Sequence, residues 1–422
     1  MNVLVINHYS CNKGDRAILY FIARELDRNG VSRITISTHD RRYWQGDTSR
    51  LQGNPDFVPW GWNTENPNVT GRLTDLKRKG RAILWRFSYS SIRRRLLKGS
   101  KIGFNRFLAN HEFLKALEQS DLVVSTGGHH ITTLLSRDAV SEQLYDMALA
   151  VLSGKPVVLW SQSIGPLNFH DPQNKLFVAE LVRRMAEILV RDHQSKDVLQ
   201  FVGFDRLAIK ETCETVIGLN DLFPNYVLPS RRAQVMGVAI YSAQRRPPTE
   251  HMRYVEIISN LISLASLSGY KVKLFPMELK NSGSDDRKMI YEIANQVNRP
   301  DFVQVIEEDM DTPTHLFEIS RCRIFVGHKT HSVIFALTAG TPLIALAYHT
   351  KTEDFMNQYG QSEFCLPDRE LELGRISQLF ENLNVRIDDV GNCIFDKSRE
   401  LGAKVRSDFA ELINRHREIE FS

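Results

Sequence analysis

Short apolar runs separated by amphipathic stretches dominate the first half of the chain. Val3–Ile6 is a continuous apolar run, rich in β-branched residues, of the kind that forms a buried parallel strand. A helical repeat of apolar residues follows it, with Asp15 where an N-cap belongs and Gly30 just past the end. The same alternation predicts strands over residues 34–37, 121–125, 156–160 and 188–192, and a helix over 172–187.

A second series of the same kind starts at Val235, after a polar stretch that we interpret as a linker. It predicts strands over 235–240, 272–275, 302–305, 323–326 and 342–346, and helices over 251–268, 285–297, 314–320 and 331–339. Strands alternating with helices on both sides of one linker predict an α/β protein with two doubly wound, Rossmann-like domains facing each other across a central cleft. We expect an N-terminal domain over 1–228, a C-terminal domain over 233–398, and a helix within 399–422 that packs back on the first domain.

Length and composition agree with this organisation. A chain of 422 residues, with 42% hydrophobic and 25% charged residues, is an ordinary globular protein that is too long for one core. No apolar run is long enough to cross a bilayer, and the N-terminus lacks the charged start of a signal peptide, so we expect a cytoplasmic protein. The five cysteines are scattered, without the spacing of a metal site.

The charge is concentrated in one segment of the N-terminal domain, about residues 76–111. Between Leu76 and His111 there are eleven basic residues and no acidic one, and aromatic residues such as Phe87, Phe104 and Phe107 are interleaved with them. This composition suits either a solvated helix pair that caps a domain or a cationic amphipathic surface over residues 77–106. Such a surface could bind an anionic membrane face, a lipid-linked diphosphate, a phosphorylated substrate or nucleic acid. Because no nucleic-acid module is recognisable elsewhere, we expect no nucleic-acid partner.

The strongest chemical motif is Gly327–Ser332, between a predicted strand and a predicted helix. It places Lys329 and His331 at a helix N-terminus, where free backbone N–H groups and the helix dipole favour a phosphate or carboxylate. Lys329 offers a point charge, and His331 could transfer a proton near neutral pH. In the alternative interpretation His331 or Ser332 caps the helix and Lys329 is solvated. Lys351 follows the next strand and faces the same cleft, unless it is a plain surface lysine.

Other candidates follow strands of the first domain. Asp15 lies in the first strand-to-helix turn, where it either caps the helix or touches a substrate. Gly127 and Gly128 let the backbone approach a ligand closely, and His129 follows them. Arg191 ends an apolar strand and could grip a carboxylate with two hydrogen bonds, although an ion pair with Asp192 or Asp221 is the structural alternative.

The ordered set of these motifs resembles the polysaccharide pyruvyl transferase family, and is similar to the colanic acid pyruvyl transferases. The order and spacing match over roughly residues 1–360. The matching pieces are Asn12–Leu19, Gly127–Gly128, Ser163–Pro166, Val190–Asp192 with Ser195, Gly327–Ser332, and Thr341–Pro342 followed by Tyr348 and Lys351.

The resemblance implies a GT-B-like arrangement and transfer of the pyruvyl group of phosphoenolpyruvate onto a sugar of a bacterial surface polysaccharide or its lipid-linked precursor, as a ketal. It implies a donor site of Arg191, Lys329, Ser332, Lys351, Gly127 and Gly128, with His331, Asp15 and His129 as catalytic candidates. It requires no metal and no cofactor beyond the donor substrate. The basic segment would then contact the lipid-linked acceptor or the inner membrane face.

One position departs from the family's pattern. Family members typically carry arginine where this chain has Lys329, and lysine keeps the charge but loses the planar fork that grips a carboxylate. Two alternatives therefore stay open at this point. One is a GT-B glycosyltransferase that uses a nucleotide sugar. The other is a non-catalytic family member that binds a polysaccharide precursor.

Overall fold

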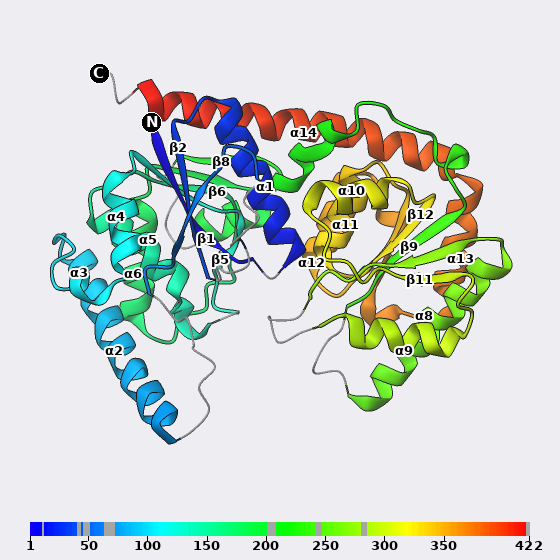
Figure 1. Cartoon of the computed structure of the whole chain (residues 1–422), viewed down its shortest axis with the longest axis horizontal. Coiled ribbons are helices and arrows are strands. Elements are labelled where there is room, and N and C mark those ends of the chain that lie inside the picture. Colours follow the sequence, from blue (N-terminus) through cyan, green and yellow to red (C-terminus); the bar gives the residue numbers. More distant parts are fainter. Residues whose placement is uncertain are drawn as a thin grey trace. The chain divides into compact units, whose positions relative to one another are not determined.

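The computed structural model describes residues 1–10, 12–39, 44, 51–62, 72–134, 136–200, 208–241, 247–279 and 285–418; of residues 72–78 it describes the backbone only (Figure 1). The chain folds into two compact units. Unit 1 comprises Met1–Ser10, Ile18–Thr215 and Arg406–Ser422, and unit 2 comprises Cys11–Ala17 and Val216–Val405. The domain boundary expected between residues 228 and 233 lies further along the chain than this division.

Unit 1 is built on a parallel sheet in the order β3-β2-β1-β4-β6-β7-β8, with β5 paired to β6. The strands are β1 (Asn2–His8), β2 (Arg33–Thr38), β3 (Asp56–Pro59), β4 (Leu122–Ser125), β5 (Gly128–Ile131), β6 (Val157–Ile164), β7 (Glu187–Val190) and β8 (Ile209–Glu211). The helices are α1 (Lys13–Arg28), α2 (Arg72–Leu97), α3 (Asn105–Leu108), α4 (His111–Gln119), α5 (Glu142–Leu152), α6 (Pro172–Arg183) and α7 (His193–Leu199).

Alternate residues of the buried strands serve opposite faces of this sheet. Leu4, Ile6 and Leu159 join the core formed with α2, α4, α5 and α6. Trp160 points to the other face, where its ring stacks on Phe21 of α1 and meets Phe409 edge-on at 4.7 Å. Phe409 belongs to α14 (Ile387–Glu418), so the end of the C-terminal helix packs on unit 1.

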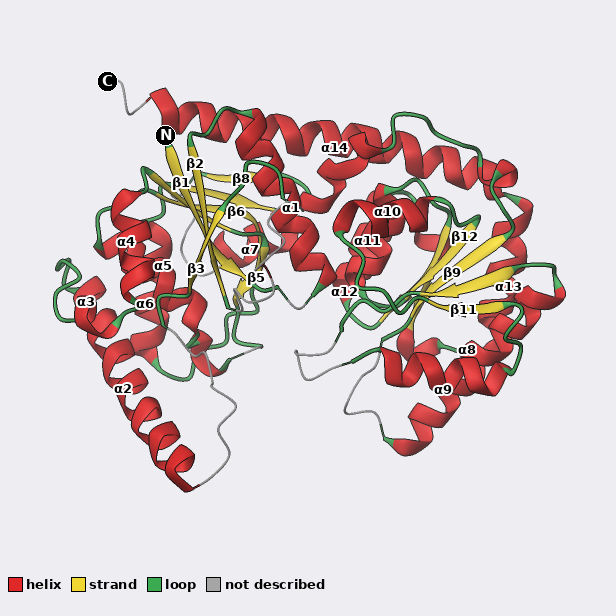
Figure 2. Ribbon diagram, viewed as in Figure 1, coloured by secondary structure: helices red, strands yellow, loops and turns green. Residues whose placement is uncertain are grey.

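Unit 2 has a six-stranded parallel sheet in the order β11-β10-β9-β12-β13-β14, the strand order of a doubly wound nucleotide-binding fold. The strands are β9 (Val235–Ala239), β10 (Lys271–Leu274), β11 (Val303–Val305), β12 (Ile324–Gly327), β13 (Leu343–Ala347) and β14 (Cys365–Pro367). Helices α8 (Pro248–Leu267), α9 (Arg287–Val297) and α13 (Leu373–Val385) cover one face, and α10 (Thr312–Ser320), α11 (Thr330–Thr338) and α12 (Thr350–Gln358) cover the other (Figure 2). Since the order reverses between β9 and β12, the residues that follow β12 lie at the switch point where such sheets bind ligands.

The predicted strands all form, and four short strands were not anticipated. β3, β8 and β14 are edge strands of three or four residues, too short to show a period, and the expected loop at Gly128 is instead the start of β5. The basic segment forms α2 and α3. None of the helices in the described part of the chain has the length and hydropathy needed to span a membrane.

Candidate active site

Strand ends position most of the predicted site residues, whereas Asp15 lies inside α1, His129 inside β5, and His331 and Ser332 in the first turn of α11. In unit 1, Gly127 and Gly128 follow β4 and Arg191 follows β7; in unit 2, Lys329 follows β12 and Lys351 follows β13. These are carboxyl ends of parallel strands, the edge at which doubly wound sheets carry their chemistry. The predicted set is therefore divided between two sheet edges, and each is described within its own unit.

Lys329 is the centre of a buried ion cluster in unit 2. Its Nζ lies 3.0 Å from an oxygen of Glu278 and 2.9 Å from an oxygen of Asp286, and the lysine is only 8% exposed. The second oxygen of Asp286 accepts the backbone N–H groups of Met277 and Glu278 at 3.0 and 2.8 Å. Lys329 is thus not a solvated lysine, and an anionic ligand must compete with Glu278 for it.

Two further cations lie at the start of α1, in the part of the helix that belongs to unit 2. Lys13 and Arg16 share the carboxylate of Asp309, with distances of 3.0 and 2.9 Å. Burial and the neighbouring Arg16 lower the pKa of Lys13 to about 8, against the pull of Asp309. Burial by itself raises the pKa of Asp309, but Lys13 and Arg16 together hold this pKa below its usual value. Sequence reasoning did not select Lys13 or Arg16 as site residues, although both lie in the Asn12–Leu19 motif that carries the family resemblance.

His331 links the two motifs directly. A Cβ atom built on Gly14 would lie 2.1 Å from Cγ of His331, so only glycine at position 14 lets the α1 turn approach this imidazole. His331 is half-buried in the first turn of α11. The structure therefore brings Lys13, His331 and Lys329 into one unit with Asp286 and Asp309.

Two helix-capping predictions are wrong. The N-cap of α11 is Lys329, without a side-chain cap, and the buried hydroxyl of Ser332 donates to the Lys329 carbonyl at 2.7 Å. The turn at α1 is closed by Asn12, whose Oδ1 accepts the N–H of Gly14 at 2.7 Å, because the helix begins two residues before Asp15. Asp15 is a half-buried residue of the first turn. Only their place in the first turns of α11 and α1 therefore supports a substrate contact of Ser332 and Asp15.

Lys351 lies in the first turn of α12, next to a capping histidine. The N–H of Lys351 donates to Nδ1 of His349 at 3.2 Å, and Lys351 is half-buried rather than a plain surface lysine. Burial and the nearby lysine lower the pKa of His349. His349 is accordingly neutral near pH 7, with its Nδ1 committed as an acceptor.

Arg191 is buried in unit 1 and paired, but with neither of the expected partners. One guanidinium nitrogen contacts the carboxylate of Glu214, which is fully buried, and Nε donates to Ser163 Oγ at 2.8 Å. Asp192 instead accepts the N–H of Ser195 at 2.7 Å as the N-cap of α7. Arg191 can bind a substrate carboxylate only if that carboxylate replaces Glu214. No spacing in the sequence indicates Glu214 as the partner.

The glycines before His129 are required by the protein's own packing. A Cβ on Gly127 would lie 3.1 Å from the Ser161 carbonyl, and one on Gly128 would lie 2.6 Å from the ring of His130. His129 is half-buried and its Nε2 contacts the carbonyl oxygen of Gly165. Burial, with nearby positive charge, lowers the pKa of His130 to about 3, so this neighbouring histidine stays neutral near pH 7.

Comparison with known proteins adds a family and a fold. The polysaccharide pyruvyl transferase family model matches residues 12–350. The amylovoran biosynthesis protein AmsJ of Erwinia amylovora is 22% identical over 440 residues, covering 98% of this chain and 100% of that protein.

Solved structures with similar folds include UDP-GlcNAc 2-epimerases and a glycotransferase. UDP-GlcNAc 2-epimerase from Neisseria meningitidis, bound to UDP-GlcNAc, superposes with a TM-score of 0.59 at 15% identity, covering 98% of this chain and 100% of that one. Anabaena Alr3699/HepE in complex with UDP-glucose gives 0.58 at 14% identity, with the same coverage. The glycotransferase of kitacinnamycin gives 0.51 at 12% identity, covering 98% of this chain and 99% of that one. At these identities the likeness shows the fold alone. It confirms the predicted two-domain, GT-B-like α/β architecture, whereas the central cleft stays a prediction.

Proposed function

The chain belongs to the polysaccharide pyruvyl transferase family and is a transferase, and from this premise we propose that it moves the pyruvyl group of phosphoenolpyruvate onto a sugar of a bacterial surface polysaccharide or of its lipid-linked precursor. The relative AmsJ is named for amylovoran biosynthesis, which supports an exopolysaccharide as the product. A cytoplasmic location, where phosphoenolpyruvate is available, is part of the same proposal.

The proposed reaction forms a ketal from one donor and two sugar hydroxyls. Protonation of the methylene carbon of phosphoenolpyruvate lets the first hydroxyl oxygen bond to C2, and that hydroxyl's proton balances the one delivered to carbon. The second hydroxyl then displaces phosphate from C2, and its proton leaves with inorganic phosphate. The protein must neutralise the phosphate and carboxylate of the donor, supply an acid to the methylene carbon, and remove a proton from the acceptor. No metal ion is needed for these steps.

The observation that carries this proposal is that unit 2 holds three buried cations near His331. Lys329 immediately precedes α11, and Lys13 and Arg16 lie on either side of Gly14, which packs against the His331 ring. Three cations near a helix N-terminus, whose dipole favours negative charge, suit a substrate with two anionic groups. Their carboxylate partners in the unliganded protein, such as Glu278, hold the cations in place until the donor replaces them. His331, in the first turn of the same helix, is our candidate acid.

Two further roles are the contact with the donor carboxylate and the base for the acceptor. Arg191 would take the donor carboxylate by exchange with Glu214. The base that activates the acceptor is Asp15 or His129, and neither is favoured by its contacts.

Thermal stabilisation by phosphoenolpyruvate tests the proposal without a known acceptor. A ligand at a hundred times its dissociation constant adds about 2.7 kcal/mol to the unfolding free energy. We expect a rise in melting temperature that Lys329→Gln and His331→Gln abolish, and that the surface controls Lys397→Gln and His251→Gln keep. A response to UDP or GDP, with none to phosphoenolpyruvate, would instead favour nucleotide-sugar-dependent glycosyl transfer.

We further propose that α2 and α3 of unit 1 form the contact with the membrane or with the lipid-linked acceptor. Exposed apolar side chains gather there, with Ile83 67%, Phe87 57%, Phe104 51% and Phe107 80% exposed. Phe104 lies 6.4 Å from Phe87 and 5.8 Å from Phe107 between ring centroids, so these rings form one patch. Basic residues surround the patch in the sequence. Apolar side chains among cations are the composition that binds an anionic interface.

Vesicle sedimentation tests this contact. We expect binding to phosphatidylglycerol vesicles and not to phosphatidylcholine vesicles, with loss of binding in Phe87→Ser/Phe107→Ser. Arg93 is a poor target because it pairs with Asp171 at 2.8 Å, whereas Arg94 is exposed, so Arg94→Glu is the better charge variant. Equal sedimentation of all variants would contradict a membrane role.

A further inference from the structure

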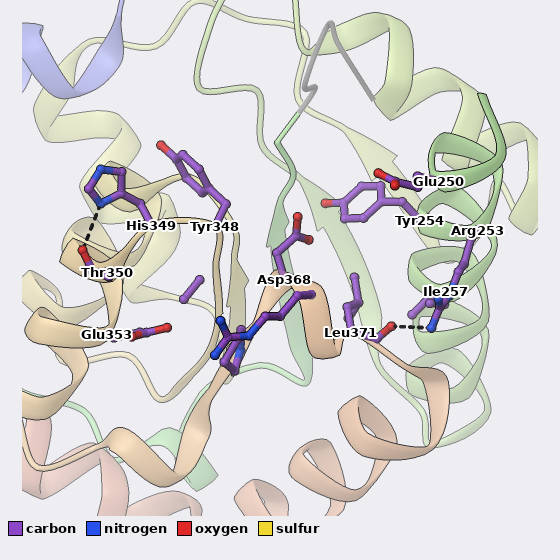
Figure 3. Close-up of a pocket in the computed structure, with 13 residues that line it drawn as sticks. Glu250, Arg253, Tyr254, Ile257, Tyr348, His349, Thr350, Glu353, Asp368 and Leu371 are labelled. Atoms are coloured by element: carbon purple, nitrogen blue, oxygen red, sulfur yellow. Dashed lines mark hydrogen bonds between the residues drawn. The ribbon is translucent and has the colours of Figure 1, made fainter. Parts of the chain in front are cut away.

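Unit 2 contains a polar pocket in addition to the Lys329 cluster. It is a pocket of about 620 Å³ at the carboxyl ends of β13 and β14, closed on one side by α8 and on the other by the start of α12 (Figure 3). This volume is in the range of pockets that enclose small molecules.

Carboxylates outnumber cations in the lining of this pocket, which favours the binding of hydroxyl groups over the binding of phosphates. Glu250, Glu353 and Asp368 line it, together with Arg253 and Arg369. Each guanidinium already lies near a further carboxylate, Arg253 at 3.7 Å from Glu372 and Arg369 at 3.6 Å from Glu370. A multiply charged anion therefore meets excess negative charge here, whereas carboxylates accept strong hydrogen bonds from neutral O–H donors.

One buried hydrogen bond and one close contact form the back wall of the pocket. The hydroxyl of Tyr254 lies 2.8 Å from Nδ1 of His328, and Nε2 of His328 lies 3.4 Å from the Asp368 carboxylate. Tyr254 and His328 are at most 2% exposed, and in Figure 3 Tyr254 and Asp368 point toward one another. The Asp368 carboxylate therefore lies against the ring of a fully buried histidine that is itself hydrogen-bonded to Tyr254.

One aromatic ring offers a flat apolar surface to the same space. Tyr348 is 40% exposed and stacks on Tyr241 at 4.3 Å between centroids. The Nζ atom of Lys329 lies 6.0 Å from the centroid of Tyr241. The pocket is thus joined to the Lys329 cluster through Tyr241 and, along the chain, through His328.

We propose that this pocket binds a neutral sugar ring of the acceptor, with its hydroxyls on Asp368 and Glu353 and its apolar face on Tyr348. Carboxylates beside an exposed aromatic ring, with the neutral His349 at the rim, match a ligand that carries many hydroxyls and no charge. The identification of the sugar as acceptor rests on the proposed function. Sugar binding itself does not.

Saturation-transfer NMR with methyl galactoside, methyl glucoside and lactose, in the absence of phosphoenolpyruvate, tests the pocket directly. We expect at least one of these sugars to bind, with affinity about tenfold weaker in Asp368→Asn and in Glu353→Gln, a change of about 1.4 kcal/mol. The control Glu363→Gln lies outside the pocket and should bind as the wild type does. Melting temperatures check the fold of each variant, and Glu353, being exposed, can be replaced without disturbing the back wall.

Three results would overturn this assignment. They are the absence of binding by all three sugars, unchanged sugar binding in both pocket variants, or binding of UMP or inorganic phosphate that the same variants abolish. Because phosphoenolpyruvate is absent, none of these results depends on the donor site. Failure of the proposed function would appear separately, as a missing response to phosphoenolpyruvate in a protein that still binds sugar.

Discussion

Asp286 holds Lys329 by one carboxylate oxygen and the backbone of residues 277–278 by the other. One fully buried carboxylate therefore sets both the orientation of the central lysine and the course of the loop that brings Glu278 to it. Breaking a buried ion pair by removing one partner is costly, because the other charge is left without compensation.

The first prediction is that Asp286→Asn lowers the free energy of unfolding by about 3 kcal/mol. The matched variant Glu278→Gln removes the other carboxylate partner of Lys329. Because the Glu278 side chain is 21% exposed, the loss of unfolding free energy should be about 1 kcal/mol or less. Urea unfolding of both proteins measures the difference. Equal losses would mean that Asp286 does not organise the cluster.

A second prediction concerns the close approach of α1 to His331. In Gly14→Ala the new methyl group would lie 2.1 Å from the imidazole, so the ring must move, at a cost of about 1–3 kcal/mol from overpacking. We expect the response to phosphoenolpyruvate to be lost together with this stability. Gly374→Ala, at a helical glycine whose added Cβ meets no atom within 4 Å, should leave both unchanged. A fully responsive Gly14→Ala would remove His331 from the proposed chemistry.

The fold was predictable because both sheets consist largely of buried parallel strands. Such strands read as continuous apolar runs, as in Val3–Ile6, and each is followed by a helix with its own period. The missed strands β3, β8 and β14 lie at sheet edges, where a few residues are ordered by pairing rather than by an apolar run. Pairing with a neighbouring strand cannot be predicted from the hydrophobic pattern of three or four residues.

The site was predictable only where it lies beside a strand end. Lys329 and His331 follow β12 and could be identified from the chain, whereas Asp286 and Asp309 come from other elements that the fold brings to them. Their partners are set by three-dimensional contact. For the same reason the structural alternative for Arg191 named Asp192 and Asp221, whereas the partner is Glu214.

That ion pair yields a third prediction. Arg191→Met alone should cost about 3–5 kcal/mol of unfolding free energy, because Glu214 would remain buried and charged. The double variant Arg191→Met/Glu214→Gln should recover most of the loss. If the recovered protein still fails to respond to phosphoenolpyruvate, Arg191 acts on the donor and not only on the fold. If both variants are equally unstable, the charge argument is wrong.

The fourth prediction follows from a histidine sealed in the core of unit 2. His315 is 1% exposed, with its ring 5.5 Å from Phe275 and 5.4 Å from Phe335 between centroids. Burial, assisted by the charges of Lys13 and Arg16, lowers the pKa of His315 well below its ordinary value of 6.5. In the folded protein it therefore stays neutral below pH 6.5, whereas in the unfolded chain it takes up a proton.

Unfolding thus binds a proton in this range, so the free energy of unfolding falls as the pH falls, by up to about 1.4 kcal/mol per unit from this residue. His315→Leu removes the titration, and its stability advantage over the wild type should widen steadily between pH 6 and pH 5. Urea unfolding at a series of pH values measures this. The control His251→Gln replaces a half-buried histidine and keeps His315, so its stability should fall with pH as steeply as that of the wild type. Parallel curves for His315→Leu and the wild type would show that His315 is protonated in the folded state, and the packing around it would then have to admit a charge.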